Sequence, residues 1–411
     1  MTRTVLVAGG GTAGHVFPAI AVAHELRALA GDVEPVFVGV ADRLEARLVP
    51  EAGFELHHID AVSIPRRPSP RLLKVPGALR AGVRQCRELI ERTGAVGVVT
   101  FGGYVSFPLD RAAHRAGVPL VIHEQNSVPG LTNRVAARWA DAVALSFPGS
   151  APRFPRPERC VVTGNPVRID VLGIDRDAQR AAARTAFGLD PDRPTMLVFG
   201  GSQGARSLNA AVVAAHGRWA GRDIQVLHAA GTGGYATAAS GWQEARSAHP
   251  DGPRTKLVDF IADMAMAYAA ADIVVCRAGA TSIAELTALG VPAVLVPYPH
   301  ATADHQMENA RALERTGGAV VVPDDELDAD ALVAAVAPLL DDPDAQARMA
   351  RSSRAFGRRD AATNVARLLL DRIGGGGHAA GHDAGDDRDD PDRPDPDPAH
   401  DHDHHDAREA P

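Results

Sequence analysis

Several residue types and patterns are scarce in this 411-residue sequence, and each absence narrows the class of protein. It has only three cysteines, Cys86, Cys160 and Cys276, and they form neither a CxxC pair nor a zinc-ligand spacing. Cysteines so far apart are typical of thiols that stay reduced, so a disulfide framework and a structural zinc site are not expected. Aromatic residues make up only 4% of the chain, whereas glycine contributes 40 residues. This composition favours an α/β protein with strands buried between helices.

Long apolar runs are also missing. No stretch of about 18 apolar residues occurs, and no signal-peptide pattern precedes the first apolar segment, Thr4–Ala8. We therefore expect a protein that is not integral to a membrane. Hydrophobic residues still make up 45% of the chain, in short runs of the kind that form buried parallel strands. A chain of this length exceeds one ordinary core, so two domains are expected.

The acidic charge of the chain is concentrated at one end. Residues 374–411 contain twelve acidic and three basic residues, so they carry −9, and residues 1–373 carry about +1 of the formal net charge of −8. This segment has four consecutive glycines followed by Asp, His and Pro, a composition that cannot bury a core. We expect a disordered, solvated tail. Its histidines could bind divalent metal, although no fixed metal site is expected. They are His378, His382, His400, His402, His404 and His405.

Two strand–glycine loop–helix units divide the rest of the chain into similar halves. GGGTAGH at 9–15 follows the first strand, and GGSQGARS at 200–207 follows a strand at Thr195–Phe199. Backbone N–H groups in such loops, with the positive end of the next helix, face an anion. Proline and glycine at 164–168 indicate a boundary. We expect a first domain at 1–164, a second at 165–345, and a final helix near 352–372 that packs back on the first domain.

The first glycine loop also partly matches a dinucleotide-binding pattern. Gly9, Gly11 and Gly14 fit GxGxxG, and a helix is predicted from about Pro18. A dinucleotide site needs an acidic residue that closes the next strand about 20 residues on, and Asp42 matches this only weakly. An NAD oxidoreductase is therefore a distant alternative, and a purely structural tight turn is another.

No acidic side chain occurs between Asp60 and Glu88. The segment 61–87 contains seven basic residues with apolar residues interleaved, a pattern that fits docking on an anionic membrane surface. It has no aromatic residues for base stacking, so nucleic acid is not expected as a partner. The alternative is a solvated loop and helix whose apolar residues face the core.

Polar residues cluster after predicted strands, where open α/β sheets bind ligands. The stretch 272–310 predicts a strand at Asp272–Arg277, a helix capped by Thr281 or Ser282 and stopped at Gly290, a strand at Val291–Val296, and a polar loop before a further helix. The two adjacent segments that follow the C-terminal ends of these strands carry Glu285, His300, Asp304, His305 and Gln306. The alternative is an ordinary βαβ unit with solvated loop residues.

Eight motifs stand in one order along the chain. They are GGGTAGHVFPA (9–19), TFGGYVSFP (100–108), HEQN (123–126), GNPVR (164–168), FGGSQGARSLN (199–209), DFIADM (259–264), CRAGATSIAEL (276–286) and DHQMENA (304–310). Together they resemble the MurG family, the N-acetylglucosaminyltransferases of peptidoglycan synthesis, over nearly all of residues 1–372. In that family the first loop usually reads GGTGGH, and Ala13 here replaces a glycine, which raises the question of loop shape.

The resemblance implies an α/β fold of the GT-B type, with two Rossmann-like domains facing across a cleft. It implies transfer of GlcNAc from UDP-GlcNAc to the C4 hydroxyl of undecaprenyl-diphosphate-linked MurNAc-pentapeptide, with inversion to a β-linkage. The family acts at the cytoplasmic face of the cell membrane as a peripheral protein. Cell-wall and division proteins are further expected partners.

Inverting transfer needs a base for the acceptor hydroxyl and a group that neutralises the departing UDP. His15 is the candidate base, because the positive end of the first helix lowers its pKa and keeps the imidazole neutral. Tyr104, His123 and Glu124 are the other candidates, and His15 has the alternative role of contacting the acceptor diphosphate or the loop backbone. No DxD metal motif follows a strand in the folded part, so neither metal nor cofactor is expected, and helix N-termini and cations are expected to stabilise the diphosphate.

The resemblance also implies the donor contacts. Ser202 and the backbone of 201–203 hold the diphosphate with Arg168, Ile261 receives the uracil through its backbone, Glu285 accepts from the ribose hydroxyls, and Gln306 binds GlcNAc. The full set from both domains is Thr12, Ala13, Gly14, Asn126, Arg168, Ser202, Gln203, Ile261, Ala280, Thr281, Ser282, Ile283, Ala284, Glu285 and Gln306.

Two other functions are compatible with these features. A UDP-GlcNAc 2-epimerase shares fold and donor but has no use for a basic, apolar membrane surface. A non-catalytic partner of a cell-wall complex would bind the sugar nucleotide without turning it over.

Overall fold

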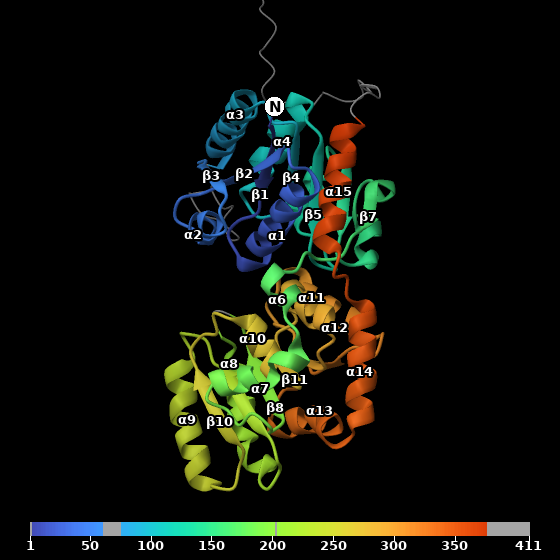
Figure 1. Ribbon diagram of the computed structural model, residues 1–411. Coiled ribbons are helices and arrows are strands. Elements are labelled where there is room, and N and C mark those ends of the chain that lie inside the picture. Colours follow the sequence, from blue (N-terminus) through green and yellow to red (C-terminus); the bar gives the residue numbers. More distant parts are fainter. Residues whose placement is uncertain (1, 61–74, 202–203, 376–411) are drawn as a thin grey trace, which may run out of the picture. The chain divides into compact units, whose positions relative to one another are not determined.

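Two parallel sheets with helices on both faces make up the part of the chain that the structure describes (Figure 1). The structure is a computed structural model, and it describes residues 2–60, 75–201 and 204–375. Residues 61–74 of the basic segment, Ser202, Gln203 and nearly all of the predicted tail lie outside the described residues.

The first sheet has the order β3-β2-β1-β4-β5-β6-β7, and every neighbouring pair of strands is parallel. Its strands are β1 (Arg3–Ala8), β2 (Val33–Gly39), β3 (Glu55–His58), β4 (Gly97–Thr100), β5 (Leu120–Glu124), β6 (Ala142–Leu145) and β7 (Cys160–Val162). The intervening helices are α1 (Ala13–Leu29), α2 (Leu44–Glu51), α3 (Val75–Thr93), α4 (Ser106–Ala116), α5 (Leu131–Ala136), and the 3₁₀ helices η2 (Pro148–Arg153) and η3 (Pro157–Arg159).

The second sheet has the order β10-β9-β8-β11-β12-β13 and is also entirely parallel. Its strands are β8 (Thr195–Phe199), β9 (Gln225–Ala229), β10 (Arg254–Val258), β11 (Ile273–Cys276), β12 (Ala293–Leu295) and β13 (Val320–Val321). Its helices are α6 (Ile169–Gly173), α7 (Arg176–Ala186), α8 (Arg206–Ala214), η4 (His216–Trp219), α9 (Tyr235–Ala248), α10 (Met264–Ala270), α11 (Ala280–Leu289), η5 (Thr302–Asp304), α12 (His305–Glu314), α13 (Ala329–Asp341) and α14 (Pro343–Phe356).

Each sheet buries both of its faces, which explains why the strands read as continuous apolar runs. In β1, Val5 and Val7 belong to one core cluster, whereas Leu6 and Ala8 belong to the cluster on the opposite face. In β8, alternate residues likewise enter two different clusters. Side chains alternate across a strand, so these runs fill two cores per sheet.

The last helix, α15 (Ala361–Gly374, red in Figure 1), packs on elements of the first sheet although it follows the second in sequence. Val365 and Leu369 share a core cluster with Val5, Val7 and residues of α1. The preceding α14 packs instead on α11 and α13. Gly357 and the short segment after it separate the two helices, so the chain crosses from one core to the other there.

Two local predictions from the sequence were inaccurate, and one strand was not predicted. Helix α1 begins at Ala13 rather than near Pro18, so Pro18 lies inside the helix. Neither Thr281 nor Ser282 caps α11, because the N-cap residue is Gly279 and both lie in the first turn, although Gly290 does end the helix with φ of 65°. Strand β3 was not predicted at all, because ELHH is short and polar, as suits an edge strand.

Within the described residues, no helix combines the length and the apolar character needed to cross a membrane.

Asp110 on α4 is a buried carboxyl that links stability to pH. Thr100 Oγ1 donates to its Oδ1 at 2.8 Å, while Oδ2 has no partner among the described residues. Burial raises the pKa of Asp110 to about 7, against a smaller lowering by the Thr100 hydrogen bond. Between about pH 4 and pH 7 the folded protein therefore keeps a proton on Asp110 that the unfolded chain has already lost. The free energy of unfolding falls as pH rises through that window.

We expect Asp110→Asn to flatten this pH dependence. Between pH 5 and pH 8 the free energy of unfolding should fall by about 2 kcal/mol more in the unsubstituted protein than in the variant. Urea denaturation at several pH values measures this difference. Asp251→Asn, at an exposed aspartate, is the matched control. Equal pH slopes for the unsubstituted protein and Asp110→Asn would contradict the assignment.

Candidate active site

The strand order of the first sheet reverses between β1 and β4, and at such a point the loops after two strands open a crevice. The loop after β1 and the loop after β4 approach very closely there. Gly103 has φ of 86°, and a Cβ at this position would lie 2.7 Å from the carbonyl oxygen of Gly10. Only glycine permits this contact, which explains the GG pair after β4.

His15 lies in this crevice, in the first turn of α1. Its Nδ1 is 3.0 Å from the carbonyl oxygen of Gly10 and 3.2 Å from Thr12 Oγ1. A carbonyl oxygen only accepts hydrogen bonds, so the neutral ring carries its proton on Nδ1. The lone pair then lies on Nε2, next to the position that a Cβ of Gly102 would take, 3.6 Å away. The half-buried imidazole therefore offers a basic nitrogen on the side away from the loop after β1 and next to the loop after β4.

The protonation state of His15 suits a base at neutral pH. Burial lowers its pKa below the usual 6.5, while the Gly10 carbonyl and the charge of Glu45 act in the opposite direction. The start of α1 adds a positive partial charge that also disfavours the imidazolium.

Glu45 was missed by sequence reasoning, because it belongs to an ordinary charged helix pattern in α2. The structure buries it to 1% exposure beneath the glycine loop, where the Gly11 N–H donates to Oε2 at 3.0 Å. A Cβ at Gly10 would lie 2.6 Å from its Oε1. The carboxylate therefore fixes the loop backbone that holds His15.

Ala13 leaves the loop unstrained. Among the described residues, the only non-glycine residues with positive φ are Ala303 and Asp304, so Ala13 has an ordinary backbone and forms the first residue of α1. Gly14 follows it, and a Cβ there would lie 3.6 Å from Thr281 Oγ1 of α11. The replacement of a family glycine by Ala13 therefore costs the loop nothing.

The other base candidates have different surroundings. His123 is fully buried, with Nε2 2.9 Å from the Gly164 carbonyl and Nδ1 3.1 Å from Gln125 Nε2, and burial lowers its pKa to about 4. Both of its nitrogens are therefore engaged. Tyr104 is half-buried beside Gly11, and burial raises the pKa of its phenol, which disfavours the anion that a base requires.

Glu124 is 2% exposed, and burial raises its pKa while four hydrogen bonds oppose this effect. Oε1 accepts from the backbone N–H and the side-chain amide of Asn126, and Oε2 accepts from Gly130 N–H and Asn133 Nδ2. Both oxygens thus hold the loop after β5 in place.

In the second sheet the strand order reverses between β8 and β11. The glycine-rich loop after β8 ends at Gly204, whose φ is 76° and whose Cβ would lie 2.1 Å from the Ala230 carbonyl oxygen. Helix α8 follows, and Ala205 caps it without a side-chain hydrogen bond. Ser202 and Gln203 of this loop lie outside the described residues, so their predicted diphosphate contacts remain predictions.

A partly buried ion pair fixes the loop after β11 against α8. Arg277 donates to Asp324 Oδ1 at 2.5 Å, to Ser207 Oγ at 2.9 Å, and to the carbonyls of Val296 and Pro297. The sequence places Arg277 at a strand end, within a recognised motif, but gives no sign of its pairing with Asp324.

Helix α11 points its first turn at the same edge of the second sheet. Gly279 provides no side-chain cap, so N–H groups of the first turn, which holds Ala280, Thr281 and Ser282, are available for a ligand. The side chain of Ile283 is 1% exposed and belongs to the core, and Ala284 packs against the same cluster. Residues 283 and 284 therefore contribute backbone and packing at this helix end.

Glu285 is a buried carboxyl of α11 with two side-chain partners. It is 6% exposed, its Oε2 accepts from the Tyr268 hydroxyl at 2.8 Å, and its Oε1 lies 3.3 Å from Arg168 Nε. Burial raises its pKa, whereas Arg168 and Tyr268 lower it. Tyr268 is a second residue that sequence reasoning missed, because it reads as a core position of an apolar helix.

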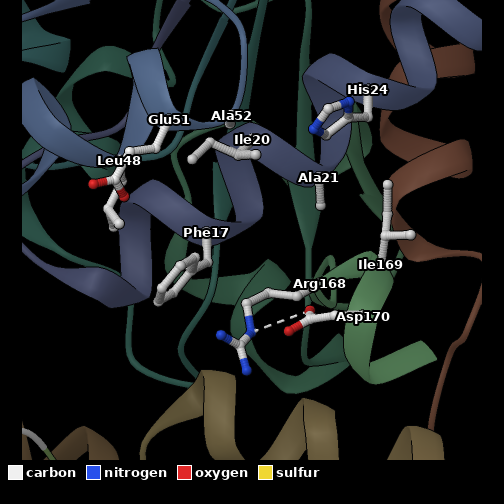
Figure 2. A pocket seen from close by; sticks show the side chains of 10 residues that line it. All are labelled: Phe17, Ile20, Ala21, His24, Leu48, Glu51, Ala52, Arg168, Ile169 and Asp170. Atoms are coloured by element: carbon white, nitrogen blue, oxygen red, sulfur yellow. Dashed lines mark ion pairs between the residues drawn. The ribbon is translucent and has the colours of Figure 1, made fainter. Parts of the chain in front are cut away.

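Arg168 lies between charged and aromatic neighbours. Its guanidinium lies over the ring of Phe17 at 4.9 Å, and its Nε is 3.7 Å from Asp170 Oδ1 (Figure 2). Nε and Nη2 are buried and make no hydrogen bond of good geometry within the described residues. Figure 2 shows this side chain at a pocket of about 520 Å³, with Phe17 and Ile20 of α1 on another wall. The guanidinium therefore brings positive charge to the pocket, with its Nε facing the carboxylates of Glu285 and Asp170.

Hydrogen bonds join the loop after β5 to α12. Asn309 is fully buried, its Oδ1 accepts from Ser127 N–H at 2.8 Å, and its Nδ2 donates to Asn126 Oδ1 at 3.2 Å. Gln306 Oε1 accepts from Tyr298 N–H at 2.9 Å, and its amide NH₂ has no partner in the described part of the chain. Asn309 lies inside the DHQMENA motif, but nothing in the sequence pairs it with Asn126.

Ile261, the predicted uracil contact, is 6% exposed and belongs to the same core cluster as Tyr268, just before α10. The two histidines near Gln306 in the sequence make only local contacts among the described residues. His305 Nδ1 is 2.8 Å from the Thr302 carbonyl, and the ring of His300 packs edge-on against Tyr298.

Comparison with known proteins identifies this architecture. The glycosyltransferase family 28 N-terminal domain matches residues 5–145, and the family 28 C-terminal domain matches residues 195–365. A Nocardioides protein described as UDP-N-acetylglucosamine–N-acetylmuramyl-(pentapeptide) pyrophosphoryl-undecaprenol N-acetylglucosamine transferase is 47% identical over 367 residues, 89% of this chain and 97% of the relative. The chain belongs to the MurG family. It is a glycosyltransferase with the GT-B fold.

Solved structures agree with membership of the MurG family. MurG of Acinetobacter baumannii is 28% identical, covers 90% of this chain and 99% of its own, and superposes with a TM-score of 0.70. A UDP-GlcNAc 2-epimerase of Neisseria meningitidis bound to UDP-GlcNAc reaches 0.66 over 90% of this chain and all of its own, at 12% identity. At that identity the likeness to the epimerase concerns the fold alone.

Proposed function

We propose that this chain transfers GlcNAc from UDP-GlcNAc to the C4 hydroxyl of undecaprenyl-diphosphate-linked MurNAc-pentapeptide, with inversion at the anomeric carbon. The names of its curated relatives support this donor and acceptor. The observation that carries the chemistry is the geometry of His15, a neutral imidazole with Nδ1 bonded to the Gly10 carbonyl and Nε2 left with a lone pair. The 2-epimerase alternative has only the shared fold in its favour.

In the proposed step, Nε2 of His15 takes the proton of the acceptor hydroxyl as its oxygen attacks the anomeric carbon of GlcNAc. The bond from that carbon to the diphosphate oxygen breaks at the same time, and UDP leaves with the bonding electrons. A single displacement of this kind inverts the anomeric configuration and needs no covalent intermediate. Tyr104 and Glu124 are the less favoured bases, because the first resists ionisation and the second has both oxygens occupied.

The departing diphosphate needs positive charge. We propose that α8, the glycine loop before it and the Arg168 guanidinium supply it, while Glu285 accepts from the ribose hydroxyls, Ile261 meets the uracil and Gln306 binds the sugar. The uncapped first turns of α8 and α11 and the positive charge of Arg168 at the pocket support this division of roles. Thr12, Gly14 and Asn126 reach the donor from the first domain.

The domains that we propose are 1–164 for the acceptor and the membrane and 165–345 for UDP-GlcNAc. Docking on an anionic surface at the cytoplasmic face of the membrane would use residues 61–87. In the described part of this segment, Arg84 and Arg87 approach Glu88 and Glu91 at 3.9 and 3.3 Å, while Leu79 and Val83 pack on the core. The docking proposal therefore depends on charge rather than on the apolar residues of α3.

A transfer assay tests the proposed function. Radiolabelled UDP-GlcNAc and a lipid-linked muramyl-pentapeptide acceptor should yield a labelled lipid-linked disaccharide. UDP-GlcNAc alone should yield no UDP-ManNAc. Formation of UDP-ManNAc without transfer would establish the epimerase, and donor binding without either product would leave only a binding role.

The same assay tests how the diphosphate is neutralised. Because helix N-termini and Arg168 carry that role in the proposal, we expect EDTA to leave the transfer rate within about twofold. The measurement is the initial rate with EDTA and with EDTA plus excess Mg²⁺. A rate that collapses with EDTA and returns with Mg²⁺ would contradict the metal-free account.

A further inference from the structure

Tyr268 is a fully buried phenol that has no place in the mechanism above. It lies on α10 with 0% exposure, and its hydroxyl donates to Oε2 of Glu285 on α11 at 2.8 Å. A buried tyrosine hydroxyl normally has a partner, and this one uses its single proton on a carboxylate. The bond therefore connects a core residue of one helix to a candidate donor-binding residue of another.

The backbone that carries Tyr268 is itself fixed. Two arginines of α7 donate to the last carbonyls of α10, Arg176 Nε to Tyr268 at 3.0 Å and Arg184 Nε to Ala270 at 3.0 Å. The Arg184 side chain is 4% exposed and also pairs with Asp272 at 2.6 Å. Cationic side chains that bind the last carbonyls of a helix hold its end in place. The tyrosine hydroxyl is therefore presented from a rigid support.

Glu285 needs this support because its position is unfavourable for a free carboxylate. Among the described residues, its other oxygen approaches only Arg168 Nε, at 3.3 Å, and core residues including Cys276 lie around it. Without the tyrosine hydroxyl, the carboxylate would have one neighbouring donor group and would be free to rotate about its terminal bond. A carboxylate has about four acceptor positions, so the two contacts leave room for a ligand diol.

We propose that Tyr268 is a positioning residue for nucleotide recognition, holding the Glu285 carboxylate in the orientation that accepts hydrogen bonds from the ribose hydroxyls of a uridine diphosphate. This inference rests on the proposed function, because it takes Glu285 as the ribose contact. The residue acts through Glu285 and does not touch the ligand. Its contribution is therefore specific to ligands that carry the ribose diol.

Calorimetric binding of two nucleotides tests the inference. The probes are UDP and 2′,3′-dideoxyuridine diphosphate, which lacks the hydroxyls that Glu285 would bind. We expect Tyr268→Phe to weaken UDP by about 3- to 10-fold, the range for one lost hydrogen bond, and to change the dideoxy nucleotide by less than about twofold. Tyr235→Phe, at a 40% exposed tyrosine on α9, is the matched control and should alter neither affinity. Equal weakening of both nucleotides, or of neither, would overturn the inference.

Two further variants keep the test decisive. In a Glu285→Gln background, Tyr268→Phe should add little, and additive losses would overturn the coupling. If Tyr268→Phe does not fold, Glu285→Asp withdraws the carboxylate from the hydroxyl while keeping its charge, and retained discrimination between the two nucleotides would overturn the inference. Transfer with no diol discrimination in the unsubstituted protein would defeat this inference and the ribose role of Glu285 but leave the proposed reaction standing. Diol discrimination without transfer would defeat the proposed reaction and leave this inference standing.

Discussion

His15→Ala is expected to lower kcat for GlcNAc transfer by about 10²- to 10⁴-fold, the usual loss when a general base is removed. The KM for UDP-GlcNAc should change little, because the imidazole faces the crevice of the first sheet and Glu285 belongs to the second. Steady-state kinetics with the lipid-linked acceptor in excess measures both constants. A near-normal kcat would remove His15 from the role of base.

His249→Ala is the control, because His249 is an exposed histidine in the second half of the chain. Its kcat should stay within about twofold. The pH profile separates a base from a structural histidine. Only neutral His15 can take a proton, and the pKa of His15 is lowered below the usual 6.5. Therefore kcat/KM should stay level as the pH falls from about 8 to about 6.5, and it should decline only at lower pH, where the imidazole becomes protonated. His15→Ala should lose this acid limb, and an unchanged limb in the variant would assign the titration to another group.

Glu285→Gln is expected to raise the KM for UDP-GlcNAc by about 10- to 100-fold, because hydrogen bonds to a charged group contribute about 1.5–3 kcal/mol. Glutamine keeps the size of the side chain but loses the charge that faces Arg168 and one of the oxygens available to a diol. The loss should appear mainly in KM and in the affinity for UDP, with a smaller change in kcat, since the ribose lies away from the reacting carbon.

Glu244→Gln, at an exposed glutamate on α9, is the control for this experiment and should leave both constants unchanged. Thermal denaturation of each variant separates a lost contact from a lost fold. A Glu285→Gln enzyme with normal KM and reduced kcat would contradict ribose binding and would place the carboxylate in the chemical step.

Much of the fold follows from local patterns in the sequence. Short apolar runs such as Thr195–Phe199 predict buried parallel strands, because a strand covered on both faces has no polar alternation. Glycine-rich loops after strands were also evident in the sequence, but that the backbones of two loops nearly touch at Gly103 and at Gly204 was not predicted. The eight ordered motifs indicated the family, which the comparisons confirm.

The sequence could not say which partner each polar side chain has. Glu45 looks like a surface residue of α2 and yet lies beneath the glycine loop, while Asn309 pairs with Asn126 across 183 positions. Such contacts depend on which strand ends meet in space. That is set by sheet order, and the local periodicity of a strand is the same whatever its neighbour.

The stretch 272–310 shows both sides of this division. Its sequence alone determined a strand, a helix ended by Gly290, a second strand and the placing of Glu285 near a strand edge. Only the tertiary structure decided that Glu285 is held between Tyr268 of the preceding helix α10 and Arg168 from a much earlier segment of the chain. The physical reason is that an apolar run fixes a strand through its own burial, whereas a buried charge is stable only with partners that folding brings to it.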